Sequence, residues 1–190
     1  EVAPRSSSPG PAATAPSTAP AGLYSPISGL GWESYLNDRL DAELARSASF
    51  EQDLSLLVFA YEGLSPGSAE YGLVAKAIAD FFSFKDLSFE RGPEGFAIVL
   101  PNIDADHGLR MAEEFLKKLA GLFKEGSEPL AAPPAFIGLS SRAGRLVDAA
   151  RVTQEAEAAL KKAREDRDSH IVAFRPDPDK YRLYLASKGC

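Results

Sequence analysis

The sequence predicts an α+β fold, and two kinds of pattern support this prediction. Segments in which apolar residues recur at helical spacing alternate along the chain with short apolar runs of strand length. Two of these short runs flank a tight turn, as the strands of a β-hairpin do. The chain has 190 residues, of which 45% are hydrophobic and 25% charged. This length and composition suit one globular domain with a buried core.

Charge and cysteine content narrow the choice of partners and location. The formal net charge is −6, so the chain offers no broad basic surface to a nucleic-acid polymer or an anionic membrane. The single cysteine, Cys190, excludes an internal disulfide framework and a zinc site built on cysteines. No apolar run is long enough to span a bilayer. We therefore expect a cytoplasmic domain without direct membrane insertion. A membrane tether through an absent upstream segment is a further option, because the chain begins with Glu1 rather than Met.

Composition divides the chain into three parts. Residues 1–22 are almost entirely Pro, Ala, Ser, Thr and Gly, and they can bury too little to offset the entropy of ordering them. We expect a disordered linker there. Residues 23–176 hold all the periodic apolar segments and form the predicted domain. Residues 177–190 begin within a Pro-Asp-Pro stop and are expected to be a C-terminal tail.

The first half of the domain predicts a helix, a strand and a second helix. Apolar side chains at helical spacing predict a helix from about 32 to 47. "LSLLVFAY", residues 54–61, is a continuous apolar run that predicts a strand buried on both faces. "SAEYGLVAKAIADFFSF" returns to a helical period over 68–84. Its predicted buried side consists of Leu73, Ala77 and Phe81, with Val74 and Ile78 close by.

The second half predicts a hairpin followed by two helix and strand pairs. "LSFER" and "GFAIVLP" flank a turn of at most four residues and are expected to pair. Next we expect a helix over roughly 104–123, capped by Asp104 or Asn102, a strand at 135–140, a long helix over 146–167 and a last strand at 170–174.

The order of these elements specifies the architecture. The middle six follow the order β-α-β-β-α-β, the split βαβ arrangement of a ferredoxin-like sandwich, with a mainly antiparallel sheet and the crossover helices on one face. We therefore predict a ferredoxin-like βαββαβ core with an N-terminal helix and an extra C-terminal helix and strand. This architecture carries many unrelated functions, so it does not specify one.

The turn "GPEG" at 92–95 is the most informative short motif. On residue types alone it is an ordinary type I turn, which favours Pro at its second position and Gly at its fourth. The sequence has no G-x-S-x-G elbow, no P-loop and no G-x-G-x-x-G. His107 and His170 are the only histidines. Without further ligands at usable spacing, we expect both to be structural or solvated.

Five strings in order along the chain resemble the GGDEF family, the diguanylate cyclases that join two GTP molecules into cyclic di-GMP. They are "SPISGL", "RGPEGFAIVLP", "AFIGLS", "EAEAALKKAR" and "HIVAF". The resemblance covers roughly residues 25–174. It implies phosphoryl transfer, in which a divalent metal and positioning do most of the work.

At the positions that bind metal and phosphate in the GGDEF family, this chain has different residues. The resemblance implies an Asp at the end of the first strand, where this chain has Ala60, and places Glu62 on the second acid. In the signature loop, Glu94 keeps the third, acidic position, whereas Pro93 replaces the second glycine and Gly95 replaces the fourth acid. A proline there adds a ring and removes an N–H donor, so a phosphate would lose room and a hydrogen bond.

The nucleotide-reading and inhibitory positions differ as well. The guanine-reading stretch is shortened to "LSPGSAEYGL", which has no Asn and in which Glu70 could stand for the last acid. Arg164 falls where the family has a phosphate-facing Lys, which keeps the charge and changes the shape. At the inhibitory R-x-x-D motif the chain has Ser83 and Asp86, so the guanidinium fork that reads guanine and phosphate is missing.

The sequence therefore predicts a degenerate GGDEF-like domain that is catalytically inactive and serves as a signalling or protein-interaction module. We assign no catalytic and no metal-binding residue, and keep Glu62, Glu70, Glu94 and Arg164 as residual candidates for binding a ligand. No cofactor is expected, and Mg²⁺ and GTP enter only if residual activity exists. A protein partner or an upstream sensor segment is expected, and a homodimer is a further option. The alternatives are a residual diguanylate cyclase and a receptor for GTP or cyclic di-GMP.

Overall fold

The structure is a computed structural model that describes residues 22–124, 134–166 and 168–188. The predicted disordered linker at 1–22 lies outside these residues except for its last position. So does most of the loop between the third helix and the fourth strand.

One five-stranded sheet forms the centre of the domain, in the order β2-β3-β1-β4-β5. The strands are β1 (Leu54–Tyr61), β2 (Ser88–Arg91), β3 (Gly95–Pro101), β4 (Ala135–Ser141) and β5 (Ile171–Ala173). β1 pairs antiparallel with both β3 and β4, β2 pairs antiparallel with β3, and β5 pairs parallel with β4. This confirms the predicted ferredoxin-like core and the extra strand at its edge.

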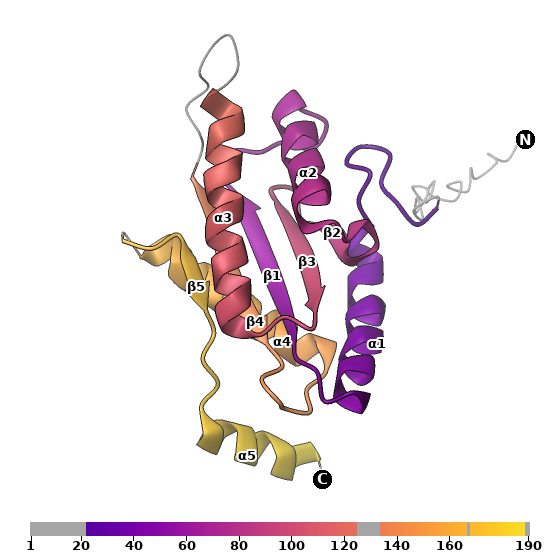
Figure 1. The fold of residues 1–190 in the computed structure, drawn as a ribbon, viewed down its shortest axis with the longest axis vertical. Helices are drawn as coiled ribbons and strands as arrows, with labels where there is room; N and C mark the ends of the chain where they lie inside the picture. Colours follow the sequence, from indigo (N-terminus) through magenta and orange to yellow (C-terminus); the bar gives the residue numbers. More distant parts are fainter. Residues whose placement is uncertain (1–21, 125–133, 167, 189–190) are drawn as a thin grey trace, which may run out of the picture.

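Two helices cover each face of the sheet (Figure 1). They are α1 (Leu36–Ser49), α2 (Ala69–Phe82), α3 (Ala105–Lys124) and α4 (Ala149–Glu165). Because side chains alternate along β1, Leu57, Phe59 and Tyr61 enter the core under α2 and α3, while Leu54, Leu56 and Val58 enter the core under α1 and α4. The crossover helices α2 and α3 thus share one face, as the sequence predicts.

The buried side of α2 matches the predicted one at Ala77 and differs from it at Leu73 and Phe81. Leu73 remains 37% exposed and Phe81 is half-buried, whereas the buried residues are Tyr71, Val74, Ala75, Ala77, Ile78 and Phe82. Packing is therefore centred on the row that the sequence analysis placed only close to the buried side. An apolar helix such as this one has a wide apolar surface, so its periodicity does not fix which row faces the sheet.

Capping residues explain where α3 and α4 begin. Asp104 Oδ1 accepts a hydrogen bond from the His107 N–H at 2.7 Å, so Asp104 is the cap of α3, while Asn102 has the left-handed φ of 57°. α4 starts at Ala149, later than the predicted residue 146, because Asp148 Oδ1 accepts from the Arg151 N–H at 2.8 Å. At the N-terminal helix, a 3₁₀ turn, η1 (Glu33–Tyr35), precedes α1. A second such turn, η2 (Lys85–Leu87), follows α2.

The C-terminal tail contains a helix, α5 (Pro178–Lys188), that the sequence analysis did not predict. None of its residues is buried. Tyr184 donates to Asp148 Oδ2 at 3.3 Å, Lys188 forms an ion pair with the same carboxylate at 3.3 Å, and the Tyr181 hydroxyl accepts from a loop N–H at 2.7 Å. Polar contacts and rings, rather than an apolar stripe, hold α5 on the domain, so helical hydrophobic periodicity could not indicate it.

Gly138 sets how closely α4 approaches the sheet. A Cβ added at this position would lie 2.1 Å from the Ala156 carbonyl oxygen and 2.3 Å from the Leu160 nitrogen. Both neighbours are backbone atoms of α4, so they cannot move aside without moving the helix.

Replacing Gly138 with Ala is expected to lower the free energy of unfolding by about 1–3 kcal/mol or more, because α4 must shift away from β4. Urea denaturation measures the change. Gly121→Ala on α3 is the matched control: its added Cβ meets nothing within 4 Å, and alanine in a helix should add about 0.5–1 kcal/mol of stability. Equal stabilities of the two variants would contradict the close backbone contact.

A buried ion pair also fastens α4 to the loop that follows β4. The Arg145 guanidinium donates from both terminal nitrogens to Glu155, at 2.8 Å each. Glu155 further accepts from the Ser140 hydroxyl at 2.8 Å and from Arg151 Nε at 2.9 Å. Burial alone raises the pKa of Glu155, but these hydrogen bonds, led by those from Arg145, outweigh it and hold the pKa below its ordinary value.

Glu155→Gln should destabilise the domain by about 3–5 kcal/mol at neutral pH, because Arg145 is left buried without its counter-charge. Since the folded-state pKa of Glu155 is lowered, its contribution is complete above the unfolded-state pKa of about 4.3 and is lost as the pH falls through the folded-state value. Urea denaturation at pH 7 and in acid should therefore show a difference between wild type and variant that shrinks in acid. A difference that stays constant would contradict this assignment.

Candidate functional site

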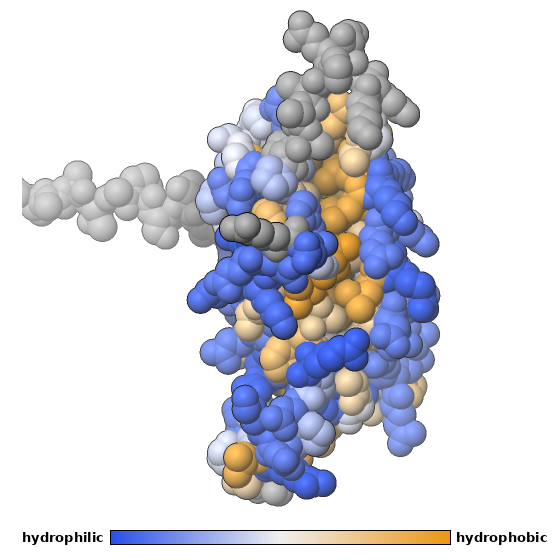
Figure 2. All heavy atoms as spheres, turned by 90° about the vertical axis from the view of Figure 1, so that its left-hand side faces the viewer, coloured by the Kyte–Doolittle hydropathy of each residue, from blue (hydrophilic) through white to orange (hydrophobic). Residues whose placement is uncertain are grey.

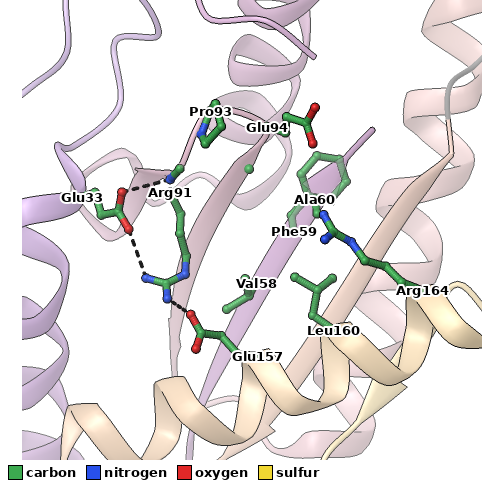
Figure 3. A pocket seen from close by; sticks show the side chains of 12 residues that line it. Glu33, Val58, Phe59, Ala60, Arg91, Pro93, Glu94, Glu157, Leu160 and Arg164 are labelled. Carbon is green, nitrogen blue, oxygen red and sulfur yellow. Dashed lines mark hydrogen bonds and ion pairs between the residues drawn. The ribbon is translucent and has the colours of Figure 1, made fainter. Parts of the chain in front are cut away.

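A pocket of about 390 Å³ lies beside the tip of the β2–β3 hairpin (Figure 3). The loop 92–94 forms one wall, and η1 and α4 supply side chains around it. Val58, Ala60 and Leu160 contribute the apolar lining. Because β1 side chains alternate, Ala60 faces the same side as Val58, which places it in this pocket.

Hydrogen bonds from the end of β1 and the residue pair after it hold the hairpin loop. It has three residues between Arg91 and Gly95, and Gly92 adopts φ 61°, a conformation that favours glycine. The Glu94 carbonyl oxygen accepts from the Tyr61 N–H at 2.9 Å. The Glu94 carboxylate accepts from the Gly63 N–H at 3.3 Å, so it is drawn to the segment that follows β1.

Arg91 is held between two carboxylates. Its guanidinium forms an ion pair with Glu157 on α4 and another with Glu33 on η1 at 3.4 Å. The second oxygen of Glu33 accepts from the Gly92 N–H at 2.9 Å. Figure 3 shows both glutamates turned toward the Arg91 side of the loop. One carboxylate thus satisfies a loop N–H and part of a guanidinium at the same time.

Arg164 lies near the C-terminal end of α4 and lines the same pocket. It is exposed, and it makes no ion pair within the part of the chain that the structure describes. Glu157, Leu160 and Arg164 are spaced three, four and seven residues apart, which places them on one face of α4. The spacing of Glu157 from Arg164 could have identified Glu157 as a site residue, but it was not predicted.

The structure therefore brings two of the four predicted site residues together and leaves two apart. Glu94 and Arg164 line the pocket, whereas Glu62 and Glu70 do not. Glu62 is exposed just beyond β1, and Glu70 lies in the first turn of α2. Glu70 is close enough to Tyr61 to add to the rise in its pKa to about 12, of which burial is the main cause. Arg91 and Glu33 were not predicted, because their contacts join segments far apart in sequence.

A second cavity, of about 210 Å³, has a different character. It is lined by apolar residues of α3 together with Tyr61 and His170. Figure 2 shows an apolar band on the face where α3 and β5 lie. None of the predicted site residues lines this cavity.

Comparisons of the sequence with known proteins give one partial match. No protein-family model matches the chain. An uncharacterized protein of Treponema pallidum (strain Nichols) is 42% identical over 69 residues, 36% of this chain and 39% of that protein. The matched segment thus spans about two-fifths of that relative.

Solved structures match over most of the domain. The GGDEF domain of DgcB from Caulobacter crescentus, in complex with c-di-GMP, has a TM-score of 0.67 at 18% identity, covering 82% of this chain and 98% of its own. The diguanylate cyclase SiaD from Pseudomonas aeruginosa, in complex with its activator SiaC, has a TM-score of 0.61 at 20% identity, covering 80% of this chain and 62% of its own. The chain has the GGDEF-domain fold. At these identities the similarity establishes the fold alone.

The residues at the metal position of the GGDEF fold do not suit Mg²⁺, which requires several oxygen ligands in octahedral geometry. Ala60 offers no side-chain oxygen and Glu62 does not line the pocket, so of these three positions Glu94 alone brings a carboxylate to it. Within the described ranges no cluster of three or more His, Cys, Asp or Glu could hold a metal ion. We therefore derive no chemical step through a metal here.

The position of the GGDEF inhibitory motif is also altered. Ser83 has the left-handed φ of 56° and ends α2. Asp86 accepts a hydrogen bond from the Tyr24 hydroxyl, which raises the Tyr24 pKa. A side chain of the same chain thus occupies the acid that the resemblance assigns to inhibitor binding. Among the helices described, none is both long and apolar enough to cross a membrane.

Gly95, at the fourth letter of the GGDEF loop, has no room for a side chain in this backbone. An added Cβ would lie 2.7 Å from the Phe59 carbonyl oxygen and 2.8 Å from the Arg91 carbonyl oxygen. Gly95→Glu, which restores the acid of the motif, should therefore lower the free energy of unfolding by about 1–3 kcal/mol. It should produce no cyclic di-GMP from GTP.

Thermal or urea denaturation of Gly95→Glu, with a cyclic di-GMP assay, checks this expectation. Glu94→Gln, one residue earlier and close in size to the native side chain, is the matched control and should stay within about 0.5 kcal/mol of wild type. A Gly95→Glu variant as stable as the control would show that the loop backbone relaxes freely.

Proposed function

We propose that this chain is a catalytically inactive GGDEF-like domain that serves as a signalling or protein-interaction module in cyclic di-GMP-related signalling. The observation that carries the proposal is Ala60, which lines the pocket at the end of β1 where the GGDEF resemblance implies a metal-binding aspartate. Without that oxygen the pocket lacks the ligand set that would hold Mg²⁺ on a triphosphate.

The charge of the pocket supports the same conclusion. Three glutamates line it, Glu33, Glu94 and Glu157, against two arginines, Arg91 and Arg164. The glutamates therefore leave the ionisable lining with a negative balance. A nucleoside triphosphate carries several negative charges of its own, and without a bound metal to neutralise them this balance disfavours its binding.

A structure of the same fold in complex with another protein supports a role in protein interaction. SiaD is described in complex with an activator protein, and we propose for this chain a protein partner or an upstream sensor segment as its input. A cytoplasmic location belongs to the same proposal, since the sole cysteine, Cys190, suits a reducing compartment.

A receptor for GTP or cyclic di-GMP is the second candidate. The specific observation in its favour is Arg164, an exposed cation that lines a pocket of about 390 Å³ and has no ion-pair partner among the described residues. A guanidinium in such a position recognises a phosphate or a carboxylate by paired hydrogen bonds. This candidate requires binding without turnover.

Incubation of the protein with GTP and Mg²⁺, followed by chromatography for cyclic di-GMP, tests the main proposal. We expect no product above a no-protein blank, with the same result for Glu94→Gln. Calorimetric titration with GTP and cyclic di-GMP separates the interaction module, which shows no heat of binding, from the receptor. Product formation that disappears in Glu94→Gln would refute inactivity and favour a residual cyclase.

A further inference from the structure

The contacts of Glu33 and Glu157 have a consequence for regulation of the same pocket. We propose that these two carboxylates are internal substitutes for an anionic ligand, and that withdrawing them opens a metal-independent site for a phosphate-bearing anion, built from Arg91, the Gly92 N–H and Arg164. The inference rests on the proposed function, since it takes the pocket to be free of catalysis.

The groups that the two glutamates occupy are of a kind that binds phosphate. A backbone N–H beside a guanidinium is a typical recognition pair for phosphate oxygens. Here Glu33 Oε2 accepts from the Gly92 N–H at 2.9 Å, and Glu33 Oε1 and Glu157 accept from the two terminal nitrogens of Arg91. The Gly92 N–H and both terminal nitrogens of Arg91 are thus already bound to internal anions, whereas Arg164 makes no ion pair among the described residues.

The side chains of Glu33 and Glu157 are about half exposed to solvent. The Glu33 side chain is 51% exposed and that of Glu157 is 48% exposed, while Arg91 is 21% exposed. Exposed ion pairs contribute little free energy each. The two carboxylates are therefore weakly held competitors, and a small displacement of them is enough to release the donors.

Backbone contacts of the segment just before Glu33 position this residue. Two residues earlier, Gly31 bridges the edge of β2: its N–H donates to the Ser88 carbonyl at 2.9 Å, and its carbonyl accepts from the Glu90 N–H at 2.9 Å. An added Cβ on Gly31 would lie 2.5 Å from the Phe89 ring. The segment that leads into α1 is thus fixed to the sheet edge next to the loop, and displacement of that segment carries Glu33 away from Gly92.

The charge balance of the pocket depends on Glu33 and Glu157. With both glutamates in place, three carboxylates face two guanidinium groups in the pocket. When Glu33 and Glu157 are neutral or withdrawn, Arg91 and Arg164 face Glu94 alone, and the balance becomes positive. Arg164 then lies across the pocket from Arg91 (Figure 3), which suits an anion with more than one phosphate.

The double variant Glu33→Gln/Glu157→Gln tests the inference, with inorganic pyrophosphate as the probe in buffer that contains EDTA. Calorimetry should show pyrophosphate affinity about tenfold or more above wild type, and the Gly92 amide signal in a ¹⁵N–¹H spectrum should shift on titration. Glu113→Gln/Glu114→Gln on α3, two exposed acids that do not line the pocket, is the control with the same charge change and should bind as wild type does.

A second variant tests the positioning of Glu33 without changing any charge. Gly31→Ala should move the leading segment off Phe89 and shift the Gly92 amide signal in the absence of ligand, while pyrophosphate affinity rises in the same direction as in the double variant. Thermal denaturation confirms that each variant is folded before titration.

Two results would overturn the inference: a double variant that binds pyrophosphate no better than the charge-matched control, or a wild type that binds it as tightly as the double variant. Both outcomes are independent of turnover. Cyclic di-GMP formation by wild type would instead refute the proposed function, so the two failures are distinguishable.

Discussion

The antiparallel pairing of β1 with both β3 and β4 is the constraint on which the rest of the domain depends. Every residue of β1 is buried, and its alternating side chains enter two separate cores, one under α2 and α3 and one under α1 and α4. The same alternation decides the site. It sends Tyr61 into one core and leaves Ala60, which has no side-chain oxygen, facing the pocket.

Backbone groups of the neighbouring strands contact the loop beside that pocket closely. Tyr61 and Gly63 donate hydrogen bonds to Glu94, and the carbonyl oxygens of Phe59 and Arg91 close around Gly95. The fourth letter of the motif is therefore part of the sheet packing. An acid at this position would need both strands beside it to move.

Much of the fold could be predicted from the sequence because it rests on local patterns. The five strands, the hairpin and the order of the helices follow from apolar runs and turn residues, and Asp104 was readable as a cap. The packed row of α2 was not, because an apolar helix offers more than one face. At the site, Glu94 and Arg164 were found from motif positions, and Glu157 could have been found from its spacing to Arg164 on α4. Glu33 could not, since the hydrogen bond to Gly92 joins residues 59 positions apart.

The attachment of α5 has a consequence for local dynamics. Its Tyr181 and Tyr184 rings lie against the guanidinium groups of Arg145 and Arg151, and none of its side chains is buried. An eleven-residue helix is marginally stable in water on its own. We therefore expect α5 to unfold when it detaches, while the core of the domain stays folded. Its amide protons should exchange with solvent through this local opening, on a far shorter timescale than those of β1, whose exchange requires the whole sheet to open.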